Sequence, residues 1–550
     1  MTNFLIRKTG NDLYGGTSPT LLATFTSSSN GTTVTATTSV FTPSHVGQAI
    51  KASSVLGPYI ITGYISATQV TATVSGATWG SLTTYLGGAW ASISSTTANS
   101  SLLPSGSNVY IGAGVYNNGN TLNGAVGLNY YADTSGQYTT DAGEVILSAF
   151  TSGTKSTPSS IPVISPNNNT TFTGFTVIGG TVAGSCVSSA GSGVTFTDCV
   201  FNGLAGSGAF PAVTLANSST VPALAHTFER CVFIAHPTTT TSAVLITLTT
   251  NSISGADYNS NIVFRNCLVQ SFGATGAAIA IQSSGASLYR GGGVTVYDST
   301  IMGPTYGVWN QGANLSTTVA NTVYNSVIVA ASTALQQTGG LLTDGGYNAL
   351  YASTAGVTTG TGSILNNIEP RLELGQSTKI TGLTKPFLSP LSGSPFLGNG
   401  SAGTPPVVDF LNRPKPSGGG SGSAATGYLE LHDFAIQDTT VYPPGYTSSA
   451  KLVGPGDQYL LIPVDPIAHQ FSVQVYQGSG YTGTSYATAT ILANGELGVS
   501  AQTVTASSTL SAWQTLAFSS ITPSKAGFIT LQVTSYDTSG TGTLNFGAIN

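Results

Sequence analysis

Charged side chains are scarce in this chain of 550 residues. Asp, Glu, Lys and Arg together make up 6% of it, whereas a typical globular protein has about 25%. This scarcity excludes a fold built mainly on Lys- and Glu-rich helices. The net charge of −5, with only 14 basic residues, argues against a nucleic-acid partner. Since 40% of the chain is hydrophobic, it does not have the composition of a disordered protein either. These exclusions leave a large β protein whose surface carries hydroxyl groups instead of charges.

Long apolar runs and a set of paired cysteines are also missing. No run of about 18 apolar residues is present, so we expect no membrane span. Only three apolar residues precede Arg7 and Lys8, which predicts that there is no signal peptide and that the chain is made in a cytoplasm. Four cysteines do not form a disulfide framework. A surface of extracellular style without an export signal indicates a virion protein, assembled in the host cytoplasm and released by lysis.

A six-residue segment recurs through the middle of the chain. Positions one, four and six are apolar or small, whereas a plain strand alternates with a period of two. The third position therefore predicts a one-residue bend in the left-handed region, which Gly, Asn and Asp tolerate best; Arg230 is the exception. The six copies are Phe172–Val177, Phe196–Phe201, Phe228–Phe233, Phe264–Val269, Val296–Ile301 and Val323–Ile328, with Gly174, Asp198, Arg230, Asn266, Asp298 and Asn325 at the bend.

A second family of short strands lies between these segments. Its members are Ala212–Leu215, Val244–Thr247, Ala278–Ile281, Gly307–Trp309 and Ala334–Leu335. Each repeat then contains a strand, a turn, a strand, the bend and a further strand. Repeats of about 25–35 residues with several short strands predict a parallel β-solenoid, in which each coil buries its inner face against its neighbours.

With these motifs the chain resembles the right-handed parallel β-helix of pectate-lyase-like proteins, especially phage tail spikes and other virion proteins. The resemblance covers residues 1–20 and 86–415, implies a homotrimer, and leaves activity open because the fold hosts lyases, hydrolases and inert fibres alike. Further segments that carry it are the opening strand Phe4–Asp12 with Gly15–Pro19, a short Trp-containing helix at Ala89–Ile93, the first coil Gly106–Tyr116, and the closing pattern Leu388–Pro395, Gly400 and Asp409–Arg413.

Three other regions complete the predicted organisation. Residues 21–85 interrupt the pattern as a small inserted β module, and inserts of this kind in the resembling virion proteins often sit at the attachment end. We therefore expect this N-terminal region to dock on other virion proteins. Residues 416–426 form a Gly/Ser linker. Alternating strands at residues 427–550 predict a jelly-roll β-sandwich similar to carbohydrate-binding modules.

Catalytic residues are hard to find in this sequence. Glycoside hydrolysis needs two carboxylates, yet the second strand family contains no carboxylate and no base. Corresponding residues of adjacent coils stack, so Asp198 should pair with Arg230 and Glu229 with Arg265. These four residues are the alternative catalytic set, although pairing with Arg lowers the pKa of a carboxylate and spoils it as an acid.

Metal and cofactor sites are not expected either. Cys199, Cys231 and Cys267 share one inward position, which Ser299 and Ser326 continue, and their spacing follows the coil, not a zinc motif. The five histidines are scattered. The segment Asp344–Asn348 is interpreted as a turn between coils.

Aromatic side chains surrounded by Asn, Gln, Thr and Ser suit neutral glycans. The predicted glycan-binding residues are Trp309, Tyr289 and Tyr306 on the solenoid and Trp513, Tyr442, Tyr446 and Tyr481 in the C-terminal region. Core filling is the competing interpretation, especially for Trp513.

The leading hypothesis is a virion structural protein, a spike, fibre or other appendage on a capsid or tail, that binds host-surface glycan. The alternative is a tail-spike depolymerase, a polysaccharide lyase or hydrolase. The sequence favours the first and leaves catalysis open. Neither hypothesis needs a cofactor, a nucleic acid or a membrane.

Overall fold

A computed structural model gives the fold. It describes residues 3–547 except 13, 15, 18–20, 53–55, 75–76, 94–95, 97–102, 118–125, 149–161, 180–184, 190, 204–210, 218–223, 236–241, 251–257, 272–275, 284–288, 304, 312–314, 366–371, 377–385, 391–429, 432–435, 439, 447–448, 454–455, 465, 484, 494–496, 525–526 and 540–541. The predicted linker at 416–426 and the closing residues Gly400 and Asp409–Arg413 lie outside the described residues.

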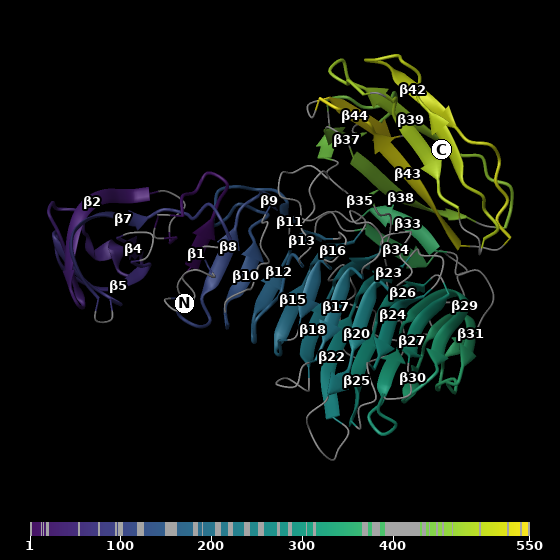
Figure 1. The fold of residues 1–550 in the computed structure, drawn as a ribbon, viewed down its shortest axis with the longest axis horizontal. Helices are drawn as coiled ribbons and strands as arrows, with labels where there is room; N and C mark the ends of the chain where they lie inside the picture. The colour runs from purple at the N-terminus through teal and green to yellow at the C-terminus, as the bar shows by residue number, and fades with distance from the viewer. Residues whose placement is uncertain are drawn as a thin grey trace.

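A right-handed parallel β-helix forms the central part of the molecule (Figure 1). Its first wall is a parallel sheet in which each strand pairs with the next coil. The strands are β1 (Asn3–Ile6), β8 (Asn108–Ile111), β10 (Asn129–Ala132), β12 (Thr171–Thr173), β15 (Val194–Thr197), β18 (Ala225–Glu229), β22 (Tyr258–Arg265), β25 (Tyr289–Tyr297), β28 (Asn321–Tyr324) and β30 (Leu342–Gly346). The short β21 (Thr249–Thr250) pairs with β25 at its edge.

The second and third walls belong to one 15-stranded sheet, because β29 (Val327–Gln337) runs through both. The second wall contains β9 (Gly114–Asn117), β11 (Val145–Ser148), β13 (Thr176–Ile178), β16 (Val200–Asn202), β19 (Val232–Ile234), β23 (Leu268–Gln270), β26 (Thr300–Gly303), β31 (Ala349–Ala355) and β32 (Ile364–Leu365). The third wall contains β14 (Val187–Ser189), β17 (Val213–Ala216), β20 (Val244–Thr247), β24 (Ala277–Gln282) and β27 (Tyr306–Gln311).

The predicted bend between the first and second walls is confirmed. All six third-position residues have a positive φ, between 50° for Asn325 and 83° for Gly174. Arg230, the unexpected residue type, has φ 52°. The backbone hydrogen bonds continue through the bend, since Asp198 N–H donates to Glu229 O and Arg230 N–H donates to Arg265 O. One left-handed residue thus makes the corner between the first and second walls without interrupting the hydrogen bonds between coils.

Aromatic rings fill the interior behind the first wall. The rings of Tyr130, Phe172, Phe196, Phe228 and Phe264 form a continuous column, with neighbouring centroids 5.0–5.2 Å apart and interplanar angles of 14° or less. All five are fully buried. Offset aromatic stacking adds to the free energy of burial, so this column favours one register between coils.

The N-terminal end of the solenoid is closed by Trp90. Its ring stacks on Phe4 with centroids 5.5 Å apart, and its Nε1–H donates to Tyr14 O at 2.8 Å. The predicted helix at Ala89–Ile93 is wrong: Trp90 instead forms a parallel bridge to Ile6. Burial of the whole indole and the backbone hydrogen bonds of Trp90 with Leu5 and Arg7 hold this residue against the first strand.

The predicted turn at Asp344–Asn348 is also wrong in part. Asp344 to Gly346 form the end of β30, and Tyr347 takes the bend conformation with φ 56°. After Val323 the register shifts by one residue, which offsets this last copy of the repeat from the coil before it. The copy therefore does not align with the other six in the sequence.

Antiparallel β modules flank the solenoid. The inserted module is a closed barrel of β2 (Leu21–Asn30), β3 (Thr33–Ala36), β6 (Gln69–Ala72), β5 (Tyr59–Ser66), β4 (Ala49–Lys51) and β7 (Thr78–Gly87), with a 3-10 turn at Pro43–His45. A hairpin of β33 (Leu372–Gln376) and β34 (Pro386–Pro390) follows the solenoid. No helix in the described part of the chain is long and apolar enough to cross a membrane.

The C-terminal region is a sandwich of two five-stranded sheets. One has the order β35-β38-β43-β40-β41 and the other β36-β37-β44-β39-β42. Without β35 and β36, the eight remaining strands have jelly-roll order. Their bounds are β35 (Glu430–Leu431), β36 (Ile436–Asp438), β37 (Ser449–Val453), β38 (Gly456–Val464), β39 (Ser472–Gln477), β40 (Thr488–Ile491), β41 (Gln502–Thr505), β42 (Trp513–Ala517), β43 (Gly527–Ser535) and β44 (Thr543–Gly547).

A histidine side chain points into the solenoid interior. His226 is 1% exposed, between Val194 and Ile262 of the adjacent coils, and its Nε2 lies 2.7 Å from Ser189 Oγ. Nδ1 has no hydrogen-bond partner among the described residues. Burial lowers the pKa of His226 to about 4, with the backbone of Ala225 opposing the shift.

This histidine makes the solenoid sensitive to acid. Below pH 6.5 His226 binds a proton in the unfolded chain, whereas in the native chain it stays neutral down to about pH 4. The free energy of unfolding therefore decreases as the pH falls through this window. The predicted loss from His226 alone is about 3 kcal/mol. Denaturant unfolding at pH 7, 5.5 and 4 should show a smaller loss in His226→Gln than in the wild type. An equal loss in both proteins would contradict the assignment.

Candidate functional site

The outer surface of the first wall carries two parallel rows of polar and aromatic side chains. Residues of each row are register partners in successive coils and are mostly half-buried. The amide–hydroxyl row is Asn3, Asn108, Asn129, Thr171, Thr195, Thr227, Val263, Thr295 and Thr322. The mixed row is Tyr110, Tyr131, Thr173, Thr197, Glu229, Arg265, Tyr297 and Tyr324. Strand alternation explains both rows, because every second side chain points away from the core.

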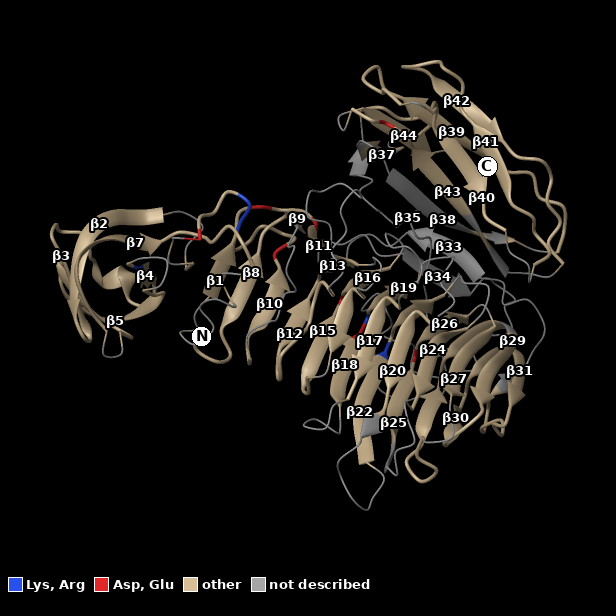
Figure 2. Cartoon of the chain, in the orientation of Figure 1, with Lys and Arg blue, Asp and Glu red and all other residues tan. Residues whose placement is uncertain are grey.

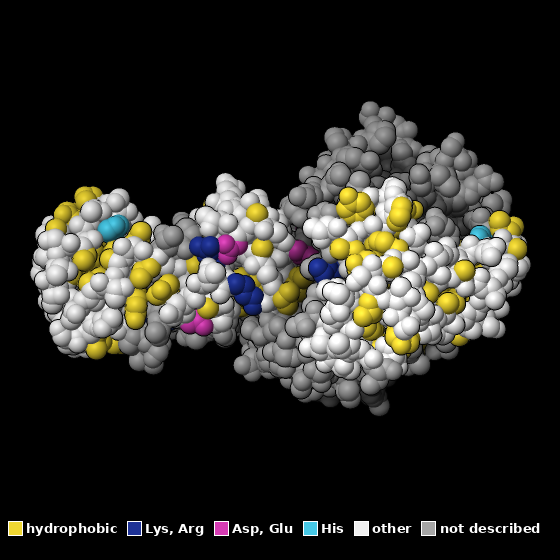
Figure 3. All heavy atoms as spheres, turned by 90° about the horizontal axis from the view of Figure 1, so that it is seen from above, with side chains coloured by type: hydrophobic (Ala, Val, Ile, Leu, Met, Phe, Trp, Pro, Cys, Tyr) yellow, Lys and Arg dark blue, Asp and Glu magenta, His cyan; other side chains and the backbone are white. Residues whose placement is uncertain are grey.

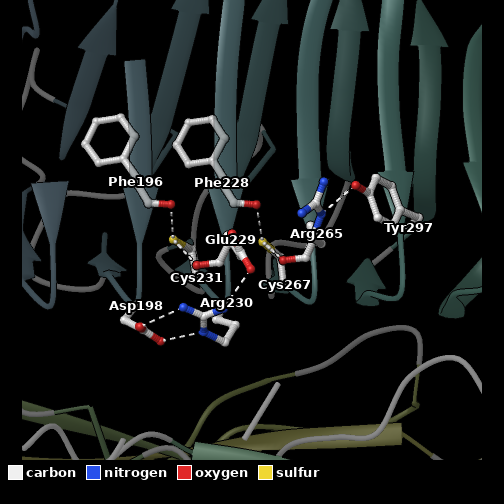
Figure 4. A network of polar contacts seen from close by, with 9 residues as sticks. All are labelled: Phe196, Asp198, Phe228, Glu229, Arg230, Cys231, Arg265, Cys267 and Tyr297. Atoms are coloured by element: carbon white, nitrogen blue, oxygen red, sulfur yellow. Dashed lines mark hydrogen bonds and ion pairs between the residues drawn. The ribbon is translucent and has the colours of Figure 1, made fainter. Parts of the chain in front are cut away.

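The four residues of the alternative catalytic set, Asp198, Glu229, Arg230 and Arg265, lie close together at this surface (Figure 4). Arg230 binds Asp198 of the preceding coil through two hydrogen bonds, Nε to Oδ1 and Nη2 to Oδ2, each 3.1 Å long. Its Nη1 donates to Glu229 Oε1 at 2.7 Å. The predicted pair of Asp198 with Arg230 is therefore confirmed, and one guanidinium binds two carboxylates.

The predicted pair of Glu229 with Arg265 is wrong. The two residues are register partners, but Glu229 is bound by Arg230, its neighbour in sequence. Arg265 instead donates from Nε to the hydroxyl of Tyr297 in the next coil, with its guanidinium carbon 5.1 Å from the Tyr297 ring centroid. The ring and hydroxyl of Tyr297 together hold Arg265. The prediction had considered only a carboxylate as its partner.

This network does not suit acid–base catalysis. The side chain of Asp198 is 4% exposed, and both of its oxygens accept from Arg230. Burial lowers the pKa of Arg230, but the hydrogen bonds and charges of Asp198 and Glu229 outweigh it and raise that pKa above its ordinary value. Arg230 thus binds both oxygens of Asp198 and Oε1 of Glu229, so these carboxylates are directed at the guanidinium and not at a substrate.

The third wall has no charged side chain along its described strands, in agreement with the sequence. Two predicted glycan-binding residues meet there. The rings of Tyr306 and Trp309 lie 4.7 Å apart at 45°, and Trp309 Nε1–H donates to Thr338 Oγ1 at 3.1 Å. Both are half-buried. For Tyr289, the third solenoid residue of the prediction, the structure describes no side-chain position.

The predicted aromatic residues of the sandwich differ in exposure. Tyr442 and Tyr446 are 43% and 44% exposed. Trp513 is half-buried and packs against Tyr476, its register partner, at 5.5 Å. Tyr481 is 5% exposed, and its hydroxyl accepts from Tyr536 N–H. The ring of Tyr481 therefore belongs to the sandwich core, and the other three remain accessible.

The stacked cysteines serve packing. Cys199, Cys231 and Cys267 are buried and not disulfide-bonded, and the thiols of the last two donate to Phe196 O and Phe228 O of the preceding coils (Figure 4). Ser299 continues the column and accepts from Cys267 N–H. No group of three potential metal ligands occurs among the residues that the structure describes.

Several aromatic residues of the mixed row were not singled out from the sequence. Tyr297 and Tyr324 stack at 5.1 Å with an interplanar angle of 7°, and Tyr110 and Tyr131 stack at 5.3 Å. The first two occupy the second position of the six-residue repeat, the same position as Glu229. This shared position in the repeat could have shown that both tyrosines lie on the outer surface beside Glu229.

Comparison with known proteins gives fold likeness only. No family model and no curated protein matches the chain. Among solved structures, pectate lyase Pel9A has 13% identity over 59% of this chain and 90% of its own, with a TM-score of 0.32. The enzymatically active domain of bacteriophage CBA120 tailspike protein 4 has 8% identity over 83% and 66%, with a TM-score of 0.25. Tailspike gp49 of Acinetobacter baumannii bacteriophage Fri1, a capsular polysaccharide depolymerase, has 10% identity over 80% and 72%, with a TM-score of 0.23. What this chain shares with them is the parallel β-helix. At such low identities and TM-scores, its activity must be judged from its own residues.

Two substitutions of Arg230 separate the contribution of its ion pairs from the strain of its left-handed backbone conformation. Arg230→Ala removes the ion pairs and keeps a left-handed residue with a Cβ, whereas Arg230→Gly removes the ion pairs and relieves the backbone. We expect a loss of about 3 kcal/mol in the glycine variant, since Asp198 is left buried without its cation, and roughly 1 kcal/mol more in the alanine variant. Thermal and denaturant unfolding measure both. If the alanine variant were as stable as the glycine variant, the claim that a residue with a Cβ is strained at this bend would be wrong.

Proposed function

We propose that this chain is a virion appendage that binds host-surface glycan without cleaving it. The observation that carries the proposal is the outer surface of the first wall, where amide and hydroxyl groups form one row and aromatic rings stand beside them. Hydroxyl-rich sugars need donors and acceptors at regular intervals, and apolar sugar faces pack on rings. Corresponding groups of successive coils repeat about every 4.8 Å. Amides or hydroxyls therefore recur in every coil of their row except at Val263, and tyrosine rings stand at both ends of the mixed row.

The distribution of charge supports binding to uncharged or weakly charged glycans. Lys, Arg, Asp and Glu appear at only a few places on the fold (Figure 2), and the face in Figure 3 shows wide areas without them. Where carboxylates and a guanidinium group do meet, in the network of Asp198, Glu229 and Arg230, both acids are ion-paired with the arginine. A highly charged polysaccharide finds no field of opposite sign here.

The roles of the other regions follow the resemblance of the sequence to tail spikes. In this proposal the barrel at the N-terminal end docks on other virion proteins, and the solenoid acts as a stiff spacer. The sandwich presents Trp513, Tyr442 and Tyr446 as a second set of glycan contacts, and three copies assemble into a homotrimer. Tyr306 and Trp309 provide an aromatic pair on the third wall.

A depolymerase is the second candidate. The specific observation in its favour is that Asp198 and Glu229 lie at the edge of the same outer surface, in contact with one arginine. Cleavage would require one of them to leave the ion pair when substrate binds.

The test is incubation of the full chain with purified bacterial capsular polysaccharides and lipopolysaccharides. Binding is measured by surface plasmon resonance, and cleavage by new reducing ends and by the absorbance of unsaturated sugars. We expect binding without cleavage. The affinity should change little between ~0.05 and ~0.5 M NaCl, because few charges take part.

Either of two results would contradict this proposal. Release of reducing ends or unsaturated sugars that is lost in Asp198→Asn or Glu229→Gln would establish the depolymerase. An affinity that falls steeply with salt would show that charge, not hydroxyl and ring contacts, holds the glycan.

A further inference from the structure

Three tyrosine rings stack on the outer surface of the first wall near its N-terminal end. Tyr110 on β8 and Tyr131 on β10 are register partners, with ring centroids 5.3 Å apart and an interplanar angle of 22°. Tyr138, from the loop after β10, also stacks on Tyr110, with ring centroids 3.8 Å apart and an interplanar angle of 18°. Tyr138 is 37% exposed and the other two are half-buried. The stack is thus partly open to solvent, as a ligand site must be.

The loop that supplies Tyr138 is held in one conformation by a buried carboxylate. Asp133, 5% exposed, accepts from the backbone N–H groups of Gln137, Tyr138 and Thr139 at 3.0, 2.8 and 2.6 Å. The hydroxyls of Thr139 and Ser135 donate to it as well, at 2.8 and 3.2 Å. Five donors converging on one side chain order the loop before any ligand arrives. A preordered site loses less conformational entropy on binding.

Amide groups line one side of the stack. Asn129 Nδ2 donates to Asn108 Oδ1 at 3.2 Å, and Asn108 Nδ2 donates to Asn3 Oδ1 at 3.3 Å. Thr171 Oγ1 donates to Asn129 Oδ1 at 2.8 Å. Asn3, at the exposed end of this chain of hydrogen bonds, donates its Nδ2 protons to no described residue. Its amide is available to a sugar hydroxyl and is polarised by the bonds behind it.

The charged side chains near this loop are engaged by other groups of the protein. Arg7 binds Asp141 through Nε and Nη2 at 2.9 and 2.6 Å, and Lys8 lies over the ring of Tyr116 at 4.5 Å. The hydroxyl of Tyr110 carries no charge at neutral pH. Burial, the hydrogen bond to Tyr138 and the nearby tyrosines raise the pKa of Tyr110 to about 12, against the opposing hydrogen bond of Asn108. The surroundings therefore suit a neutral ligand.

We infer that Tyr110, Tyr131 and Tyr138 form a preordered binding site for a neutral sugar unit, with Asp133 as the positioning residue. The ligand's apolar C–H face packs on the accessible tyrosine surface, and its hydroxyls bond to the amides of the adjacent row. This inference rests on the proposed function and gives it a location and a ligand class. It also distinguishes this end of the first wall from the charged network around Arg230.

The test uses the full chain on an array of purified bacterial capsular polysaccharides and lipopolysaccharides, sorted into neutral and acidic. Tyr138→Ala should weaken the binding of a neutral glycan roughly tenfold, the scale of one lost ring contact. Tyr138→Phe should stay within about twofold of the wild type, because the ring remains. Tyr64→Ala, which removes an exposed tyrosine of the barrel, is the matched control and should have no effect.

Asp133 is tested by a double-mutant cycle. Asp133→Asn should weaken binding, but the double variant with Tyr138→Ala should bind no more weakly than Tyr138→Ala alone, since Asp133 acts through that ring. Additive losses would overturn its positioning role. Thermal unfolding of each variant identifies any general loss of folding.

The outcomes separate this inference from the proposed function. If the wild type binds no glycan on the array, both fail. If it binds while Tyr138→Ala and Tyr131→Ala bind equally well, only the tyrosine site is overturned. A preference for acidic glycans that these variants reduce would overturn the neutral ligand class alone.

Discussion

Every surface feature of this solenoid depends on the register between its coils. A coil of about 30 residues cannot bury its own inner face, so it is stable only when stacked on its neighbours. The column of stacked rings from Tyr130 to Phe264 and the left-handed bend residue together fix which residue lies over which. A slip by one residue would turn the inward rings outward. The outer rows exist because this slip is prevented.

The same register explains how a chain with so few charges makes a recognition surface. Repetition aligns like groups, so one amide or hydroxyl in nearly every coil becomes a row along the wall, interrupted at Val263. The few charged residues are partnered within that geometry: Arg230 reaches back one coil to Asp198, and Arg265 reaches forward one coil to Tyr297. In the proposed function, glycan binding depends on shape, rings and hydrogen bonds, which salt weakens little.

The sequence predicted the architecture well where residue type alone decides conformation. Asn266 and Asn325 marked the bend because asparagine tolerates a positive φ, and alternating hydrophobicity marked the sandwich. The coil of β10 and β11 was missed, because Tyr130 replaces the usual phenylalanine and no bend residue of the repeat separates the two strands. Trp90 was misassigned to a helix, since its burial against Phe4 and its backbone hydrogen bonds with Leu5 and Arg7 hold it extended.

The site was less predictable, for physical reasons. Register could place Glu229 beside Arg265, but the nearer Arg230 and the ring of Tyr297 decided their actual partners. Tyr138 reaches Tyr110 from a loop, and the loop's conformation depends on five hydrogen bonds to Asp133. Such convergence of local bonds leaves no periodic signal in a sequence.

The most direct test of this account is a crystal structure of the full chain with an oligosaccharide from a glycan that it binds. The account predicts an intact oligosaccharide on the outer surface of the first wall, with a sugar ring against Tyr131 or Tyr138 and no movement of Arg230 away from Asp198. A sugar bound across Asp198 and Glu229 with Arg230 displaced, or a cleaved product there, would contradict it.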